Sequence, residues 1–353
     1  KFLSNVIDPL ELIEQYGTDS LRFTLAAGSG YNRGLNLDPE RIEGYRNFIN
    51  KIWNAFRFIQ PYLEHAEDKL PETKKLSIHD KWILSELNSV TQSVNKSLEE
   101  YRFDDACSAI YQFVYDKFCS WYIELSKNIF NSQDDAAKVI RASVLKYGFK
   151  KILALLHPIT PFISEELWSN LKSNSESLLI SNTYPEFDKK LIFENEQESM
   201  NKFIDVVTVI RNLRASVNIK PKDEIDVCFF TDDPLLAEFL YENRSFLGDL
   251  AKVKTGRVQS KKEERPKKSI MGATTQAEVF ILLEGVIDLS EQVNRIKKEI
   301  EKTQNEYDKF QKKLSNPKFI ENAKKDAVEE AKNKASEFKE KLDSLVNSLS
   351  NFE

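Results

Sequence analysis

Apolar residues recur at steps of three and four along most of this chain, a spacing typical of amphipathic helices. The pattern predicts helices at about 39–63, 79–100, 104–129, 133–156 and 196–217. The apolar side of the first comprises Ile42, Tyr45, Ile49, Ile52, Phe56, Ile59 and Leu63, and that of the third comprises Ile110, Phe113, Val114, Phe118, Trp121 and Leu125. Because each helix has one face that must be buried, we predict a bundle of five or more helices.

Polar residues and prolines mark where several helices begin. Asp8 and Asp38 each precede a proline, a pair that caps a helix and fills its first position. Gly17 ends the first short helix, and Thr18 can begin a second. The string "HPITPFISEELW" places two prolines ahead of one more helix start. Two short helices are therefore expected before the bundle.

The period of the pattern changes after Pro221. "IDVCFF" and "AEVFILLEGVIDL" are short runs typical of strands, and "PLLAEFLYENRSFLGDLAKV" between them has a helical pattern. From Leu289 the apolar steps alternate between four and three, "SNPKF" interrupts them, and the rhythm then continues to Leu349, which indicates an antiparallel two-helix coiled coil. We predict a mainly α chain with four parts: connecting helices over 1–36, a helix bundle over 37–221, a small α/β subdomain over 222–287 and a coiled-coil hairpin over 288–353.

Composition narrows the class of protein. Of the 353 residues, 41% are hydrophobic and 30% are charged, which excludes general disorder. No apolar run approaches the roughly 20 residues that cross a bilayer, so no membrane partner is expected. The three cysteines, Cys107, Cys119 and Cys228, lie far apart, fit a reducing compartment and are expected to be buried thiols. The chain shows no signal segment, and we predict a cytoplasmic protein.

One segment departs from the overall net charge of −5. Residues 252–268 contain eight Lys or Arg residues against two Glu residues, a local balance of +6. Such a block is usually a solvated flexible loop, but it can also be a patch that contacts phosphates. Both interpretations stay open at this point.

The sequence contains no recognisable catalytic constellation. His65, His79 and His157 are isolated, and no Gly-rich phosphate loop, nucleophile motif or spaced set of metal ligands is present. His157, between a leucine and a proline, is interpreted as a packed structural residue. We predict no catalytic residue, no metal site and no cofactor within this chain.

The helix predicted at 39–63 carries residue types that recognise RNA. Its polar side holds Arg46, Asn50, Asn54 and Arg57, whose amide and guanidinium groups can read base edges and stack on unpaired bases. Trp53 and Phe56 lie close by, but their spacing favours the interior of the bundle. The four polar residues are therefore the candidate site.

The first arm of the coiled coil is a second candidate RNA surface. Its basic residues are Arg295, Lys297, Lys298, Lys302, Lys309, Lys312 and Lys313. Carboxylates alternate with them, and a mixed-charge exterior is also what a soluble coiled coil requires. Charge alone does not decide between these two interpretations.

Seven strings in order resemble the C-terminal half of bacterial valyl-tRNA synthetases. They are "NVIDPLELIEQYGTDSLRFTLA", "RIEGYRNFINKIWNAFRF", "DKWILSELN", "CSWYIELSK", "LHPITPFISEELW", "IRNLRASVNIKP" and "LEGVIDLSEQVNRIKKEIEKTQNEYDKFQKKLSNPKFIENA". The resemblance covers essentially the whole chain. It departs from the family at "KFLSNVIDP", which retains the helix start after the ATP-binding loop without that loop's second lysine or its glycine, so Lys1 is only a doubtful remnant of it.

The resemblance implies a class I synthetase that uses ATP with Mg to attach valine to tRNA(Val). In that family the bundle binds the anticodon limb and the coiled coil supports the outer corner of the tRNA. Arg211 and Arg214 of "IRNLRA" become further candidates on the anticodon side. The catalytic and editing domains would lie upstream of the sequence considered, so we expect this chain alone to bind tRNA as a monomer without aminoacylation.

Three other readings stay open. The chain could be the equivalent part of an isoleucyl-type enzyme, although such enzymes commonly end in a cysteine-ligated zinc module that three scattered cysteines cannot form. It could be a non-catalytic helical protein whose coiled coil binds a protein partner. It could also be a complete, minimal ligase, which ATP–pyrophosphate exchange with valine would reveal.

Overall fold

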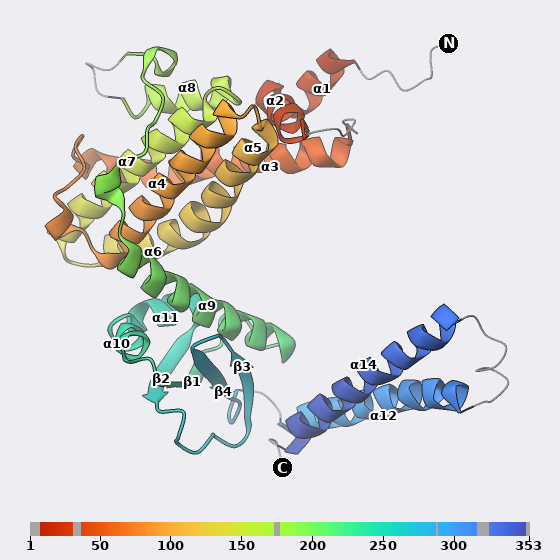
Figure 1. Cartoon of the computed structure of the whole chain (residues 1–353). Helices are drawn as coiled ribbons and strands as arrows, with labels where there is room; N and C mark the ends of the chain where they lie inside the picture. The colour runs from red at the N-terminus through yellow and green to blue at the C-terminus, as the bar shows by residue number, and fades with distance from the viewer. Residues whose placement is uncertain (1–7, 31–36, 173–176, 287–288, 316–324, 351–353) are drawn as a thin grey trace, which may run out of the picture. The chain divides into compact units, whose positions relative to one another are not determined.

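In the computed structural model, the chain divides into two compact units, residues 1–200 and 201–353 (Figure 1). The structure describes residues 8–30, 37–172, 177–286, 289–315 and 325–350. Lys1, the doubtful remnant of an ATP-binding loop, lies outside the described residues, as does most of "SNPKF".

The first unit is helical, as the apolar periodicity predicts. It contains α1 (Pro9–Tyr16), α2 (Thr18–Ala27), α3 (Pro39–Ile59), α4 (Ile78–Glu99), α5 (Phe103–Gln112), α6 (Ile123–Asn131), α7 (Asp135–Leu156) and α8 (Pro161–Ser169). Short 3-10 turns η1 (Gln60–His65), η2 (Thr73–Lys75), η4 (Leu179–Ser181) and η5 (Lys189–Leu191) lie between or after them. Helix α9 (Glu194–Ser216) begins in this unit and continues in the second.

The helix starts follow the capping signals in the sequence. Asp8 accepts a hydrogen bond from the backbone N–H of Leu10 at 2.9 Å, and Asp38 accepts one from that of Glu40 at 3.0 Å. Between α1 and α2, Gly17 has a φ of +87°, a backbone conformation that residues with a side chain rarely adopt. These local signals fix where the short opening helices begin and end.

The helix predicted at 104–129 is continuous but not uniformly α-helical. Residues Phe113–Tyr122, labelled η3, form a π-helical stretch between α5 and α6. Its wider turn lets Ser120 Oγ donate to the carbonyl of Tyr115, five residues earlier, at 2.7 Å. The predicted apolar side of this helix, Ile110, Phe113, Val114, Phe118, Trp121 and Leu125, is buried.

A buried ion pair joins α4 to α7 inside the bundle. Arg141 Nε lies 2.8 Å from Asp80 Oδ1, and both side chains are almost completely buried. Tyr122 donates to the same Asp80 oxygen at 2.6 Å, and Ser77 donates to the other through both its backbone N–H and its hydroxyl. Arg141 also donates to Ser126 and to Ser77. The Asp80 carboxylate and the Arg141 guanidinium, with the hydroxyls of Ser77, Tyr122 and Ser126, thus form one buried polar network in the bundle.

The second unit contains a four-stranded sheet with the order β2-β1-β4-β3. Its strands are β1 (Ile225–Thr231), β2 (Val253–Gln259), β3 (Ser269–Ala273) and β4 (Ala277–Leu282). Two short helices, α10 (Pro234–Glu242) and α11 (Arg244–Ala251), connect β1 to β2. Strands β1 and β2 run parallel, whereas β4 runs antiparallel to both β1 and β3. The sequence pattern predicted two of these strands, β1 and β4, although its "AEVFILLEGVIDL" run extends beyond the end of β4.

The interpretation of residues 252–268 as a loop is wrong for Val253–Gln259. These residues form strand β2, and the turn that follows is tied down where Asp232 accepts from Ser260 Oγ at 2.9 Å and from the Lys261 N–H at 3.1 Å. Arg265 pairs with Glu278 at 2.8 Å, and its guanidinium lies 4.5 Å from the centre of the Phe230 ring. Local preference in β2 is mixed, because Val253, Thr255 and Val258 favour a strand and Lys254 and Gly256 do not, and pairing with β1 decides it.

Helix α9 packs on the sheet at Gly272 of β3. A Cβ at this position would lie 2.6 Å from Val209 Cγ1 and 3.3 Å from Leu213 Cδ1, both on α9. Most of α9 therefore packs with the second unit, whereas the predicted domain boundary lies at residue 221.

Replacing Gly272 by alanine should lower the free energy of unfolding by about 1–3 kcal/mol, because overpacking forces α9 off the sheet. Gly44 in α3 is the matched control, since a Cβ there has no neighbour within 4 Å. Gly44→Ala should stabilise the chain by about 0.5–1 kcal/mol through helix propensity. Urea unfolding of both variants measures the difference, and equal effects would contradict the close contact.

The last two helices form the predicted antiparallel hairpin. Helix α12 (Leu289–Leu314) packs against α14 (Lys325–Ser350), and the Phe310 and Phe338 rings stack with centroids 5.7 Å apart. Glu299 of α12 pairs with Lys341 of α14 at 3.3 Å. All described seam residues are buried or half-buried: Val293, Ile300, Thr303, Tyr307, Phe310, Leu314, Val328, Ala331, Ala335, Phe338, Leu342 and Leu349.

Candidate nucleic-acid interface

The predicted RNA-reading residues form one exposed strip along α3. Arg46, Asn50, Asn54 and Arg57 succeed one another at steps of four, four and three, so they share one side of the helix, and all four are exposed. The strip extends about 16 Å at the helical rise of 1.5 Å per residue. Its length and its mixture of amide and guanidinium groups suit several unpaired nucleotides.

Trp53 lies on the same side of α3, and its prediction as an interior residue is wrong. Its side chain is 39% exposed, whereas Phe56 is 4% exposed and belongs to the core as expected. Both positions fit the three-and-four spacing, and only the packing of neighbouring helices decides which is covered. The exposed indole gives the strip a flat apolar surface on which a base can stack.

The structure brings Tyr115 of the π-helical stretch against Lys51 of α3, and the sequence reasoning selected neither residue. Lys51 Nζ lies 3.3 Å from the centre of the Tyr115 ring and 3.4 Å from Ser120 Oγ. Tyr115 is 39% exposed and stacks on Tyr111 with centroids 5.5 Å apart. Because Tyr115 lies in the π-helical stretch, a regular helical period does not predict where its ring points.

The two candidates on α9 differ in their surroundings. Arg211 is exposed, and its Nε donates to the Leu250 carbonyl at 3.0 Å. Arg214 is 7% exposed, and it donates to the carbonyls of Lys220, Asp223 and Ala251. The bonds to Lys220 and Asp223 hold the turn between α9 and β1, and the bond to Ala251 ties α9 to the end of α11. Arg214 therefore has a structural role that the sequence did not predict.

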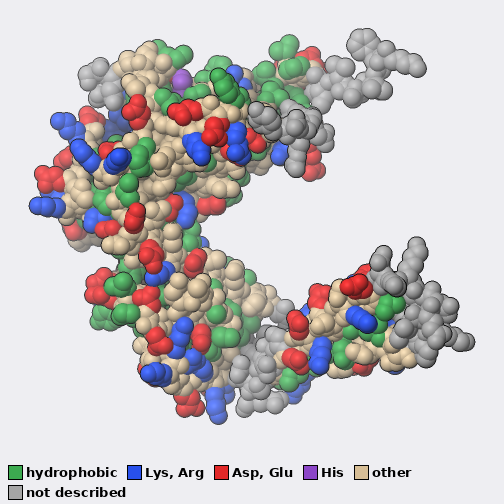
Figure 2. Space-filling view, in the orientation of Figure 1, with side chains coloured by type: hydrophobic (Ala, Val, Ile, Leu, Met, Phe, Trp, Pro, Cys, Tyr) green, Lys and Arg blue, Asp and Glu red, His purple; other side chains and the backbone are tan. Residues whose placement is uncertain are grey.

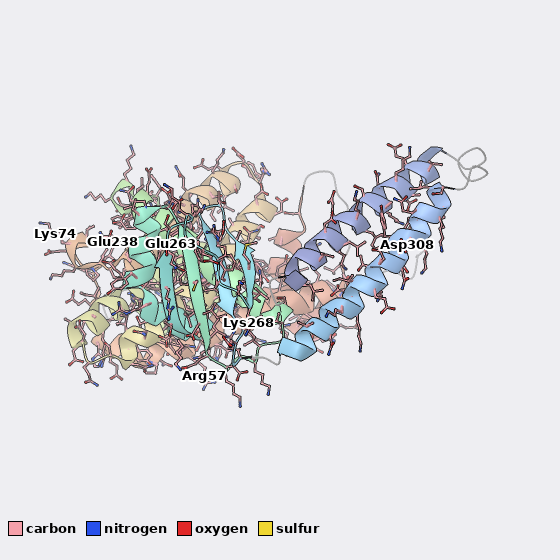
Figure 3. All side chains as sticks on the ribbon, turned by 90° about the horizontal axis from the view of Figure 1, so that it is seen from below. Arg57, Lys74, Glu238, Glu263, Lys268 and Asp308 are labelled. Atoms are coloured by element: carbon pink, nitrogen blue, oxygen red, sulfur yellow. The ribbon has the colours of Figure 1, made fainter. Side chains whose placement is uncertain are left out.

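The cations predicted on α12 are exposed wherever the structure describes their side chains. These are Lys297, Lys298, Lys302, Lys309, Lys312 and Lys313, whereas the side chain of Arg295 lies outside the described residues. Side chains project along both helices of the hairpin, Asp308 among them (Figure 3). Lys309 pairs with Glu306 at 2.5 Å. On the face of the chain seen in Figure 2, acidic and basic side chains are interspersed.

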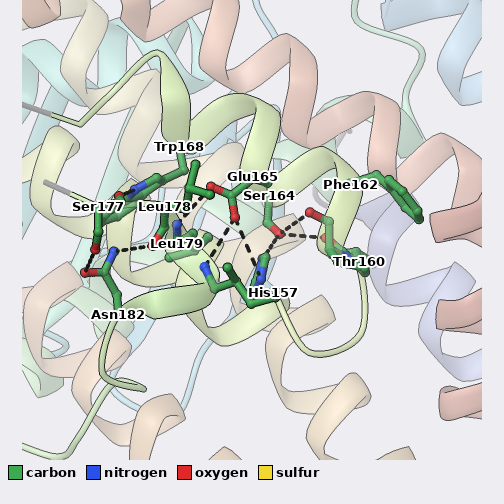
Figure 4. Close-up of polar contacts among 12 residues, drawn as sticks. His157, Thr160, Phe162, Ser164, Glu165, Trp168, Ser177, Leu178, Leu179 and Asn182 are labelled. Atoms are coloured by element: carbon green, nitrogen blue, oxygen red, sulfur yellow. Dashed lines mark hydrogen bonds and ion pairs between the residues drawn. The ribbon is translucent and has the colours of Figure 1, made fainter.

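His157, Ser164 and Glu165 come together in a way that superficially resembles a catalytic set (Figure 4). His157 Nδ1 lies 2.8 Å from Ser164 Oγ, and its Nε2 lies 3.9 Å from Glu165 Oε2. The Ser164 hydroxyl is fully buried and donates to the Thr160 carbonyl at 2.7 Å, while Glu165 accepts the backbone N–H groups of Leu179 and Ile180. Because the Ser164 hydroxyl is buried, a substrate cannot reach it. The bonds from Leu179 and Ile180 to Glu165 instead hold the segment after α8 against that helix.

The three cysteines, Cys107, Cys119 and Cys228, are buried thiols, as the sequence predicts. Burial raises the pKa of the Cys107 and Cys119 thiols to about 12. Among the described residues, no cluster of His, Cys, Asp and Glu could hold a metal ion. No helix in these residues is long and apolar enough to span a bilayer.

Comparison with known proteins decides the family. An anticodon-binding domain of tRNA ligase matches residues 80–229, and the valyl tRNA synthetase tRNA binding arm matches residues 288–353. The valine–tRNA ligase of Geobacter sulfurreducens is 38% identical over 99% of this chain and 40% of its own length. The chain belongs to the valyl-tRNA synthetase family.

Other valyl-tRNA synthetases show the same extent of similarity. The valine–tRNA ligase of Listeria innocua is 37% identical over 98% of this chain and 39% of its own length, so the chain spans well under half of these relatives. A solved structure of a LeuRS–tRNA complex from Agrobacterium radiobacter K84 aligns with 70% of this chain and 28% of its own, with a TM-score of 0.43 and 19% identity. This similarity is too low to assign a shared fold. The α3 strip precedes the anticodon-binding match, and residues 230–287 lie between the two matches.

Proposed function

We propose that this chain recognises tRNA(Val) through the exposed strip of α3, with the lysines of α12 supporting the tRNA at its outer corner. One observation carries the proposal: Arg46, Asn50, Trp53, Asn54 and Arg57 are all exposed on one side of a helix whose opposite side is buried. The strip thus combines an indole on which a base can stack with amide and guanidinium groups that can pair with base edges.

The two family matches support tRNA as the partner. We further propose that the whole protein, like the valine–tRNA ligases it resembles, attaches valine to tRNA(Val) with ATP and Mg. This chain then supplies recognition, and the catalytic groups come from the rest of the protein. The apolar seam of the hairpin is filled within one chain, which supports a monomer rather than a coiled-coil partner protein.

Replacing both Arg46 and Arg57 by glutamine should weaken binding of tRNA(Val) at least about tenfold, because each guanidinium stacks on or pairs with an unpaired nucleotide. Fluorescence anisotropy with labelled tRNA(Val) and a non-cognate tRNA, at several salt concentrations, measures the effect. Replacing Asn50 and Asn54 by alanine should reduce the preference for tRNA(Val) more than the overall affinity, since amides read base edges.

Lys74 and Lys75 provide the matched control. Both are exposed cations in η2 of the same unit, so Lys74→Gln with Lys75→Gln changes the charge equally. The control should retain nearly full affinity. If the unaltered chain does not prefer tRNA(Val), or if the control loses as much affinity as the α3 variant, the recognition role of the strip is wrong.

A further inference from the structure

A groove of about 800 Å³ lies where strand β2 meets α10 and α11. Phe229, Leu247 and Val258 contribute apolar side chains to it, and Tyr241, Arg244 and Lys254 contribute polar and cationic groups. β2 is an edge strand of the sheet, and both helices pack against it (Figure 1). Neither family match extends over its lining beyond Phe229.

The groove concentrates positive charge. Arg244, Lys254 and Arg257 are exposed, and no carboxylate is among the residues that line the groove. Arg265 in the following turn is different, because Glu278 and two backbone carbonyls already bind its guanidinium. The register pairs Arg257 with Cys228 and Val258 with Phe229, so the side chain of Arg257 begins on the sheet face opposite to Phe229. Arg244 and Lys254 are therefore the two cations available to the groove, and without an acidic neighbour in its lining they favour an anion.

An aromatic ring completes the groove. Tyr241 is 67% exposed, and the Arg244 guanidinium lies 4.8 Å from the centre of its ring. A tyrosine flanked by cations is the combination with which proteins stack an unpaired base and hold its phosphates. The volume of the groove accommodates at least one nucleotide.

We propose that this groove binds an unpaired segment of the tRNA, with a base stacked on Tyr241 and adjoining phosphates on Arg244 and Lys254. The proposal rests on the proposed function for its source of RNA, but it assigns a contact to a part of the chain outside α3 and α12. An acidic peptide added to the β2 edge would use the same cations. It would not use the flat face of Tyr241, and RNA is therefore the occupant that the lining favours.

The test measures tRNA(Val) binding to the full 353-residue chain. Tyr241→Ala should weaken binding by about 5- to 150-fold, the range for loss of one base stack, while Tyr241→Phe should retain it. Arg244→Gln with Lys254→Gln should weaken binding and reduce the slope of log K against log salt by about 1.4, as expected for two phosphate contacts to a single strand. Circular dichroism checks that each variant is folded.

Lys262→Gln with Lys267→Gln is the charge-matched control, because both lysines are exposed in the same unit and neither lines the groove. Unchanged binding in the control and losses in the groove variants support the proposal. Equal losses of affinity in the groove variant and the control would contradict a specific site, because they would show that the positive charge of this unit attracts tRNA without a defined contact. Normal tRNA binding by the groove variants would overturn it and leave an acidic peptide as the occupant to consider.

The Arg46 and Arg57 variant separates this proposal from the function proposed for α3. If the groove variants lose affinity and the α3 variant does not, the groove stands and the α3 assignment fails. If only the α3 variant loses affinity, the groove proposal fails and the α3 assignment stands. A chain that binds no tRNA overturns both.

Discussion

Replacing Arg141 by methionine is expected to lower the free energy of unfolding by about 3–5 kcal/mol, the usual consequence of leaving one charge of a buried pair without its partner. Asp80 would stay buried with a negative charge and only the hydrogen bonds from Ser77 and Tyr122. Arg141 is 2% exposed, so water cannot take the place of the guanidinium without opening the bundle. Urea unfolding followed by circular dichroism measures the loss.

Lys138→Met on the same helix is the control for Arg141. Lys138 pairs with Asp135, whose side chain is 91% exposed, and exposed pairs of this kind contribute between about 0 and 1 kcal/mol. The double variant Asp80→Asn with Arg141→Met should recover part of the stability, because it removes both charges. A loss for Arg141→Met as small as that for Lys138→Met would show that the pair does not stabilise the bundle.

The effect of Arg141 should also depend on pH. Burial raises the pKa of the Asp80 carboxyl, but Arg141 and the bonds from Ser77 and Tyr122 outweigh burial and hold the pKa below its ordinary value. A carboxyl with a lowered pKa in the folded state stabilises the fold above the unfolded pKa of about 4, and this contribution disappears as pH falls through the lowered value. The difference between wild type and Arg141→Met should therefore shrink at acid pH.

Replacing Arg214 by methionine should cost about 2–4 kcal/mol of stability, since two backbone carbonyls in the turn from α9 to β1 and one at the end of α11 lose their donor. The folded fraction should keep its affinity for tRNA(Val), because a side chain with 7% exposure presents little surface to RNA. Thermal or urea unfolding measures the first effect, and anisotropy measures the second.

Arg211→Met serves as the comparison for Arg214. Arg211 is exposed and lies less than one helical turn earlier on α9, and the loss of its bond to the Leu250 carbonyl should cost only about 0.5–1.5 kcal/mol. If Arg214→Met lost tRNA affinity while the chain kept its full stability, Arg214 would be a contact residue and its structural role would be secondary.

The sequence by itself determined the helices, their starts and the hairpin. These features depend on neighbours a few residues apart: the caps at Asp8 and Asp38, the apolar side of the helix through Phe118, and the alternating seam through Phe310 and Phe338. The ordered strings that resemble valyl-tRNA synthetases also indicated the family that the comparisons show.

Tertiary structure alone decided which polar and aromatic groups are available for binding. Trp53 and Phe56 share a spacing but not an environment, and Arg211 and Arg214 share a string, "IRNLRA", although only Arg214 is enclosed by carbonyls. In strand β2, Val253, Thr255 and Val258 favour a strand whereas Lys254 and Gly256 do not, so pairing with β1 decides its structure. A local pattern indicates the apolar side of an element, but the residues that cover each position and the strand that pairs with an edge lie far apart in sequence, so only the tertiary structure decides them.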